Sequence, residues 1–203
     1  MDLKLVLEGA IIGFSIAMPV GPIGLLCIRN SLTKGLQCGL ATGLGAACAD
    51  ALYGACAGFG VAAITSLLVS YKVALQICGG LFLCYLGASM FRVKEAGGAK
   101  EIAHKKFWPI FATTFFLTLT NPMTILSFVA IYAGLGIGNK ESSVMSAFML
   151  TGGVFLGSAL WWLILSTLSS LFKNCLTRAG SRWLNRVSGS IIFGFGLAAL
   201  CVA

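Results

Sequence analysis

The sequence predicts an all-α integral membrane protein whose six transmembrane helices form two inverted three-helix repeats, with both chain termini outside the cytoplasm. Three observations support this fold class. Of the 203 residues, 58% are hydrophobic and only 10% are charged, too few charges to cover a soluble domain. Six apolar segments have the length of a membrane span. Basic residues gather on one side of these segments, and similar motifs recur in the two halves of the chain.

A helix crosses the ~30 Å hydrocarbon core with about 20 residues. The apolar segments of about this length cover residues 3–28, 37–64, 73–91, 107–135, 142–172 and 183–201. The first segment lacks the basic start of a signal peptide, so we expect it to remain as a spanning helix. The polar stretch 92–106 is expected to be a cytoplasmic loop. It divides a single transmembrane domain into repeat one, residues 1–91, and repeat two, residues 107–203.

The positions of Lys and Arg predict the orientation, because cytoplasmic loops are enriched in both. Eleven of the 14 follow the first, third or fifth segment. Only Lys4, Lys72 and Lys140 lie on the other side. With six helices, this asymmetry places both termini outside the cytoplasm. It also accounts for the net charge of +8, and the basic residues carry no interleaved aromatics, so we expect contact with membrane lipid and no nucleic-acid partner.

An internal repeat is indicated by motifs that recur along the chain. The segment "SIAMPVGPIG" has a counterpart in "TLTNPMTILS", in which Pro122 corresponds to Pro22. A shift of 109 residues also matches three pairs of glycines: Gly43 with Gly152, Gly80 with Gly189, and Gly87 with Gly196. An odd number of helices in each repeat makes the two halves inverted in the membrane. Inverted repeats with broken helices are typical of transporters, whose binding sites lie between the halves.

Proline interrupts the first and fourth segments near their middle. The first contains Pro19, Gly21 and Pro22, and the fourth contains Asn121 followed by Pro122. Proline has no N–H and clashes with the preceding helical turn, so it leaves backbone carbonyls without partners. Such groups are tolerated at membrane depth where they line a cavity. We therefore predict a binding site for a polar solute at these five residues, although simple kinks that improve packing remain the alternative.

Asp50 lies about 13 residues into the second segment, which is about 20 Å from its start at ~1.5 Å per residue. Ionisable side chains at this depth are costly and face the interior of the helix bundle. A carboxyl there could carry a proton or pair with a substrate ammonium, or it could only bind the broken helix. Three further residues, Glu8, Arg29 and Tyr53, are candidates for a vestibule at either end of the path, against the simpler roles of interfacial charge, topology signal and aromatic packing.

No enzyme class is predicted. The sequence has no phosphate-binding P-loop motif, and no His or Cys stands with a partner for nucleophilic catalysis. The eight cysteines form no C-x-x-C pair, and the chain has one histidine. We therefore expect neither a bound metal nor another cofactor.

Three segments resemble one family. "AMPVGPIGLLCIRNSLTKGLQCGLATGLGAACADALYG" is similar to the first two helices of the LysE-type amino acid exporters of the LysE/RhtB superfamily, and "GGLFLCYLGASMFR" to the end of their third helix. "FLTLTNPMTILSF" is similar to the Asn-Pro segment of their fourth helix. Many members carry Gly-Asp where this chain has Ala49–Asp50, so the backbone beside the carboxyl is less permissive here.

The resemblance implies a secondary transporter of the bacterial inner membrane that exports amino acids or related small metabolites from the cytoplasm. It implies proton antiport, with alternating access around the two broken helices. The implied substrate and proton pathway consists of Pro19, Gly21, Pro22, Asp50, Asn121 and Pro122. The partners are then the amino acid, protons and lipid, and a homo-oligomer is left open.

Two other functions compete with this interpretation. The cadmium branch of the same superfamily exports divalent metal ions, which prefer soft or acidic ligands within the membrane. A membrane thiol-redox relay would need facing cysteines beside both breaks, but the fourth segment contains no Cys. The sequence does not identify the substrate.

Overall fold

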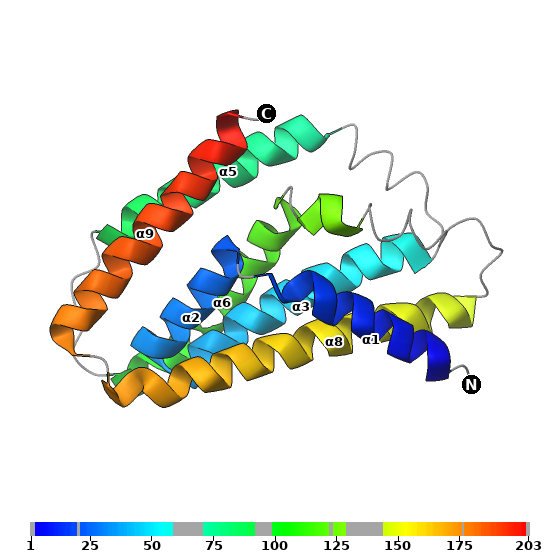
Figure 1. The fold of residues 1–203 in the computed structure, drawn as a ribbon, viewed down its shortest axis with the longest axis horizontal. Coiled ribbons are helices and arrows are strands. Elements are labelled where there is room, and N and C mark those ends of the chain that lie inside the picture. Colours follow the sequence, from blue (N-terminus) through cyan, green and yellow to red (C-terminus); the bar gives the residue numbers. More distant parts are fainter. Residues whose placement is uncertain are drawn as a thin grey trace.

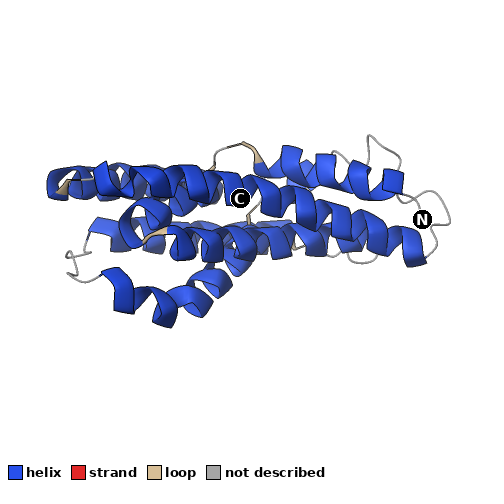
Figure 2. Cartoon of the chain, turned by 90° about the horizontal axis from the view of Figure 1, so that it is seen from below, coloured by secondary structure: helices blue, strands red, loops and turns tan. Residues whose placement is uncertain are grey.

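The computed structural model describes residues 3–19, 21–58, 71–91, 99–121, 124–128, 144–175 and 177–201. Every element in this part of the chain is helical (Figure 2). The elements in chain order are α1 (Leu3–Ala17), α2 (Pro22–Lys34), α3 (Leu36–Gly58), α5 (Lys72–Phe91), α6 (Ala99–Leu119), α8 (Val144–Leu171), the short 3₁₀ helix η1 (Phe172–Cys175) and α9 (Arg178–Cys201). Residues 124–128 form a further short helical piece after α6. The all-α prediction is confirmed for these residues.

The helices follow the predicted segments with two notable differences. The first segment is two helices, α1 and α2, which meet at an angle of 82°. The fourth begins at Ala99 rather than at residue 107, so the expected loop 92–106 is wrong over residues 99–106. The residues that start α6, from Ala99 to Ile102, are mostly strong helix formers, and helical propensity extends the element beyond the apolar stretch. Residues 59–64 and 129–135 of the expected helices lie outside the described part.

Two described helices are long and apolar enough to cross a membrane. They are α8 and the part of α9 from Arg182 to Cys201. The bent pair α1–α2 makes a third if it is counted as one span. Shorter apolar helices cover Gln76–Phe91 and Phe107–Leu119. The chain thus has the helices of a membrane protein, and the number of six spans stays a prediction.

Small residues let the helices approach closely. α1 packs on α8, and α3 packs between α6 and α8 (Figure 1). A Cβ atom on Gly13 of α1 would overlap the carbonyl of Val154 on α8, and one on Gly43 of α3 would overlap the side chain of Trp162. Close contact between helix backbones is how membrane helices associate. Gly13 and Gly43 therefore let α8 pack closely against α1 and α3.

α5 and α9 form a separate antiparallel pair along one side of the bundle (Figure 1). Two glycine contacts join them. A Cβ on Gly80 would lie 3.1 Å from the carbonyl oxygen of Gly196, and one on Gly87 would lie 2.7 Å from that of Gly189. Between these two contacts, Cys84 Sγ donates to the Phe193 carbonyl at 3.8 Å.

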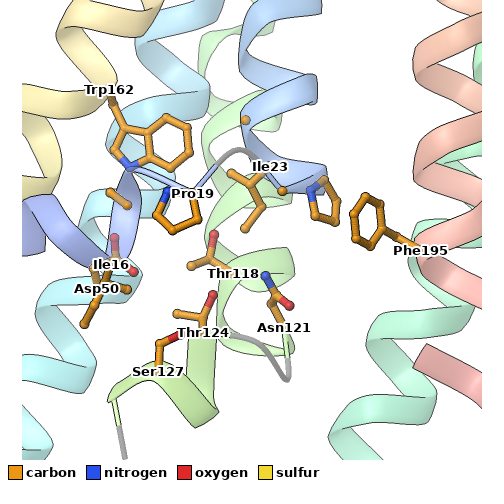
Figure 3. A pocket seen from close by; sticks show the side chains of 14 residues that line it. Ile16, Pro19, Ile23, Asp50, Thr118, Asn121, Thr124, Ser127, Trp162 and Phe195 are labelled. Carbon is orange, nitrogen blue, oxygen red and sulfur yellow. The ribbon is translucent and has the colours of Figure 1, made fainter. Parts of the chain in front are cut away.

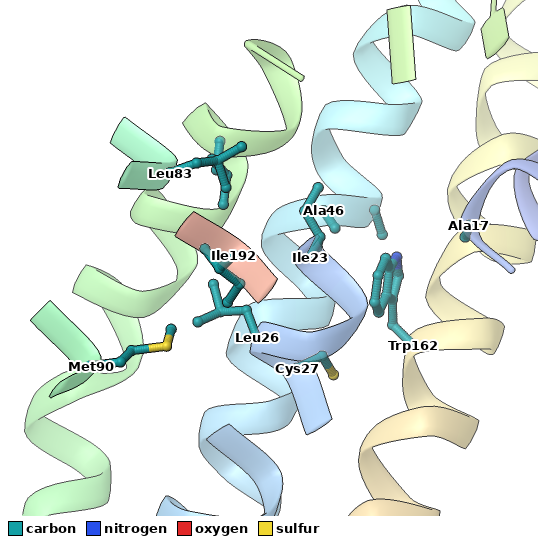
Figure 4. Packing of buried hydrophobic residues seen from close by; sticks show 11 residues of the cluster. Ala17, Ile23, Leu26, Cys27, Ala46, Leu83, Met90, Trp162 and Ile192 are labelled. Carbon is teal, nitrogen blue, oxygen red and sulfur yellow. The ribbon is translucent and has the colours of Figure 1, made fainter. Parts of the chain in front are cut away.

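The buried apolar residues form two clusters with a polar layer between them. One contains Ala46 and Ala47 of α3 with Trp162 of α8 (Figure 4). The other contains Tyr53 of α3 with Val154 of α8. On each helix one buried polar residue lies between the clusters: Asp50 on α3 and Ser158 on α8, which are 3% and 0% exposed. The fold therefore buries a polar layer in the middle of the bundle.

Candidate functional site

The first break lies between α1 and α2. Pro19 and Pro22 have no N–H, so the helical bonds to the carbonyls of Ser15 and Met18 cannot form. The Gly21 N–H donates instead to the Pro19 carbonyl at 2.9 Å. Pro22 is the first residue of α2, where a missing N–H costs nothing. No side chain caps this helix, since Gly21 is the N-cap, so the first N–H groups of α2 face outward from the helix end.

The second break follows α6. The Asn121 N–H donates to the Thr118 carbonyl at 3.2 Å, and the helix resumes when the Ile125 N–H donates to the Asn121 carbonyl at 3.2 Å. The hydroxyl of Tyr53, on α3, donates to the Leu119 carbonyl at 2.6 Å. Tyr53 therefore satisfies one of the last carbonyls of α6, for which the described residues provide no other partner.

Both breaks open into one cavity of about 300 Å³. Figure 3 shows side chains from five parts of the chain that point into it. The lining residues are Ile16, Ala17, Pro19, Gly21, Pro22, Ile23, Gly24, Asp50, Thr118, Asn121, Thr124, Ser127, Trp162 and Phe195. A cavity of this volume is at the lower end of the range for small-molecule sites.

Asp50 is the acidic residue of this cavity, and its carboxyl is held by a short chain of hydrogen bonds. Ser158 Oγ donates to Asp50 Oδ2 at 2.6 Å, and Trp162 Nε1 donates to Ser158 Oγ at 3.1 Å. Within the described residues the one ion pair joins Lys4 and Glu8, so no described cation neutralises Asp50. The carboxyl is fixed on one oxygen and is available to a cavity ligand on the other.

The cavity borders groups of opposite polarity. Asp50 offers a carboxyl, while Ile23 and Gly24 belong to the first turn of α2, whose N–H groups and helix dipole favour negative charge. The lining also holds an amide at Asn121 and hydroxyls at Thr118, Thr124 and Ser127. An apolar wall is formed by Ile16, Ile23, Trp162 and Phe195. A small molecule with one cationic, one anionic and one apolar part meets a suitable group on each side.

Five of the six residues predicted for the pathway line this cavity: Pro19, Gly21, Pro22, Asp50 and Asn121. The sixth, Pro122, lies outside the described residues. The three vestibule candidates do not line this cavity. Glu8 pairs with Lys4 at 3.8 Å on the exposed start of α1, and Tyr53 is bound to the Leu119 carbonyl. Arg29 is 5% exposed, and its Nε donates to Asn185 Oδ1 at 2.7 Å.

Several lining residues were not predicted from the sequence. Thr118, Thr124 and Ser127 join Asn121 at intervals of three residues in an apolar segment, and this polar spacing was a usable signal. Phe195, which lines the cavity, and Ser158, which binds Asp50, had no comparable signal. A serine in a small-residue helix and a phenylalanine in an apolar one are ordinary, and their roles depend on which helices are neighbours.

The chain is similar to known membrane proteins over most of its length. The family model of the LysE type translocator matches residues 14–202. YcgF of Bacillus subtilis (strain 168), which carries a provisional name as an amino acid efflux protein, is 28% identical over 95% of this chain and 94% of its own. YahN of Escherichia coli (strain K12), an uncharacterized membrane protein, is 29% identical over 84% of this chain and 77% of its own.

A shorter match is to the leucine efflux protein of Salmonella typhimurium (strain LT2), which is 30% identical over 62% of this chain and 59% of its own. No solved structure matches the chain. The family match covers both helix breaks, the acidic residue between them and most of the remaining helices. The chain therefore belongs to the LysE type translocator family of membrane transporters.

Proposed function

We propose that this chain exports amino acids from the bacterial cytoplasm across the inner membrane, in exchange for protons. The observation that carries the proposal is the cavity in which two helix breaks meet beside a buried carboxyl. The names of the relatives favour the same class of substrate, since both YcgF and the Salmonella protein are named for efflux of amino acids.

The cavity suits a free amino acid better than other small solutes. The Asp50 carboxyl accepts from the α-ammonium group, and the first N–H groups of α2 receive the α-carboxylate. Asn121 and Thr124 replace the water that the zwitterion loses, and the Thr118 hydroxyl, which donates to the Thr114 carbonyl at 2.9 Å, can still accept from the ammonium. The apolar wall takes the side chain. A dry site that pairs both charges is needed because a zwitterion without its water is otherwise very costly to bury.

Asp50 is the carrier of the coupling proton in this proposal. Its carboxyl is bound by Ser158 and has no described cationic partner. When the substrate ammonium leaves, a buried carboxylate is left without compensation, and binding a proton removes that cost. Ammonium and proton therefore compete for one group, which is the requirement for exchanging one for the other.

Inverted repeats favour a mechanism of alternating access. The contacts of the α5–α9 pair support an inverted repeat. A shift of 109 residues takes Gly80 to Gly189 and Gly87 to Gly196. The contacts join Gly80 to Gly196 and Gly87 to Gly189, so exchanging the halves turns one contact into the other. The bond from Cys84 to Phe193 spans the same 109 residues and lies between them. This is the pattern of a two-fold axis through an antiparallel helix pair.

The arrangement of helix ends supports the proposed topology. The end of α2, the start of α6, the end of α8 and the start of α9 lie together at the left of Figure 1, while the N-terminus and the start of α8 lie at the right. The basic residues Lys34, Lys173 and Arg182 belong to the first group. We propose that this end faces the cytoplasm and that both termini lie on the other side.

The alternatives have weaker support. A divalent metal ion would meet one carboxylate, an amide and hydroxyls in this cavity, and the two relatives whose names state a substrate are named for amino acids. A thiol-redox relay would need cysteines at the breaks, and the described lining residues include none.

The test is an efflux panel in bacterial cells that express the chain or carry an empty vector. The cells are fed dipeptides, which intracellular peptidases convert to free amino acids, and each amino acid is measured inside and outside. We expect at least one amino acid with an uncharged side chain to leave the expressing cells faster. Equal intracellular accumulation of all amino acids in both strains would contradict the proposal.

A further inference from the structure

We propose that Arg29, held by Asn185, forms a second binding site that captures the carboxylate of the amino acid on the cytoplasmic side of the cavity. This inference rests on the proposed export function and adds a step to it. The substrate would then meet two sites in turn. Arg29 binds its carboxylate first, and the central cavity binds the whole zwitterion.

Arg29 is a buried cation with an incomplete set of partners. Its side chain is 5% exposed, and the one hydrogen bond of that side chain among the described residues runs from Nε to Asn185 Oδ1, at 2.7 Å. No described carboxylate pairs with it, because the single described ion pair is that of Lys4 and Glu8. Asn185 is itself 8% exposed. The bond fixes the orientation of the guanidinium and leaves the two terminal amino groups as a fork.

Neither the helix dipole nor membrane topology accounts for the burial of Arg29. A cation in the last turn of a helix is stabilised by the helix dipole, and this describes Lys34, at the end of α2. Arg29 lies more than a turn earlier. A residue that only sets the topology needs no burial, and Arg186, which is also on a helix and follows Asn185 in α9, is exposed. A buried guanidinium without a counter-ion is costly in a membrane protein unless an anion visits it.

The position of Arg29 places it on the substrate path. From Pro22, at the cavity, to Arg29 is about 10 Å along α2 at ~1.5 Å per residue. Leu26, which stands between them on α2, belongs to the same packed cluster as Ile23 and as Ile192 of α9 (Figure 4). Asn185 and Ile192 belong to α9, as does Phe195 at the cavity. The contact of α2 with α9 thus runs from a charged site, through an apolar layer, to the cavity.

The chemistry of the fork identifies the group that it binds. Guanidinium binds a carboxylate through two parallel hydrogen bonds, which are stronger than a bond to an amide carbonyl. Every α-amino acid carries this carboxylate, whatever its side chain. The site therefore distinguishes amino acids from amines and does not distinguish one amino acid from another.

The experiment measures substrate uptake into everted membrane vesicles, in which the cytoplasmic face points outward. The probes are L-leucine and isopentylamine, which is leucine without its carboxyl. Arg29→Gln should raise the KM for leucine about tenfold or more, as expected for loss of a charge-assisted pair. The maximal rate and the inhibition of uptake by isopentylamine should stay unchanged. Arg29→Lys should be intermediate, since an ammonium keeps the charge and loses the fork.

Two further variants complete the test. Arg186→Gln removes an exposed charge next to Asn185 and should leave the KM unchanged. Asn185→Ala keeps the guanidinium and removes its anchor, so the KM should rise by less than in Arg29→Gln, about threefold, because the charge remains and only its orientation is lost. If Arg29→Gln does not accumulate in the membrane, the Asn185→Ala variant tests the inference in its place.

An unchanged leucine KM in Arg29→Gln, or equal weakening of leucine and isopentylamine, would overturn the inference, because either result makes Arg29 a packing residue. Wild-type vesicles that take up leucine would leave the export function standing in that case. Wild-type vesicles that take up no amino acid at all would overturn both.

Discussion

The two helix breaks reach the same cavity with different chemistry. The break between α1 and α2 contains two prolines and a glycine, bends the chain by 82° and contributes backbone groups. The break after α6 contributes polar side chains, from Thr118 and Asn121 to Ser127, and Tyr53 satisfies a carbonyl there. Both halves thus contain a broken helix. The first break supplies backbone groups to the cavity, and the second supplies polar side chains.

This difference indicates what each break tolerates. A break that binds the substrate through its backbone needs residues that interrupt the helix. Other helix-breaking residues could therefore replace the ones present. A break that binds through side chains depends on the particular polar groups. Substitutions at the two breaks should therefore impair transport in different ways.

The largest effect is expected from closing the first break with the double substitution Pro19→Leu and Pro22→Leu. Each proline disfavours a continuous helix by about 3 kcal/mol, so removing both should favour an unbroken helix and remove the helix end at the cavity. We expect efflux to fall by about 100-fold or more, on the scale of that free energy. Pro109→Leu, at an exposed proline inside α6, should leave efflux unchanged. Normal efflux in the double variant would show that the break is only a kink.

A smaller effect is expected from Asn121→Ala at the second break. This change removes a polar side chain from the cavity lining and leaves the backbone of the break in place. Loss of one or two hydrogen bonds to a charged substrate should reduce kcat/KM about tenfold, which a transport assay over a range of substrate concentrations can measure. Thr120→Val is the matched control, since the Thr120 hydroxyl is bound to the Phe116 carbonyl at 2.9 Å and is not part of the lining. Equal effects of the two changes would contradict a binding role for Asn121.

A modest effect is expected from Tyr53→Phe. The substitution leaves the Leu119 carbonyl without its 2.6 Å hydrogen bond, which should destabilise the fold by about 1–2 kcal/mol. The melting temperature of the purified protein should fall by a few degrees, and efflux should fall only slightly. An unchanged melting temperature would mean that Tyr53 does not support the second break.

The smallest effect is expected from Glu8→Gln. Glu8 lies on the exposed start of α1 with Lys4, 3.8 Å away, and exposed ion pairs contribute little. Efflux in cells should match that of the unsubstituted chain. A strong loss would instead restore Glu8 as a vestibule residue, the role that its place in the sequence leaves open.

Sequence reasoning located the breaks because proline acts on its own helix, and Pro19, Pro22 and Asn121 needed no knowledge of neighbours. It located Asp50 because a carboxyl deep in an apolar segment is rare. It could not place these residues in one cavity, since that depends on how α3, α6 and α8 pack. The same limit applies to Ser158, because its role depends on the hydrogen bond to the Asp50 carboxyl on α3.

Arg29 and Tyr53 show a further limit. Both were candidates for a vestibule, and the structure buries both against specific partners, Asn185 and the Leu119 carbonyl. A basic residue at the edge of a predicted span looks exposed in sequence, because the partner that covers it lies 156 residues away. The early start of α6 at Ala99 has a different cause, since hydropathy marks the apolar part of a helix and not the polar turns that continue it.

The central claim is that Asp50 exchanges a proton for the amino acid, and one measurement tests it directly. Everted membrane vesicles are prepared with an acidic interior, and the collapse of the proton gradient is followed with a pH-sensitive dye when L-leucine, or the amino acid that the efflux panel ranks first, is added. The unsubstituted chain and Glu8→Gln should release protons from the vesicles, and Asp50→Asn should release none while it accumulates normally in the membrane. Proton release by Asp50→Asn at the rate of the unsubstituted chain would contradict the claim.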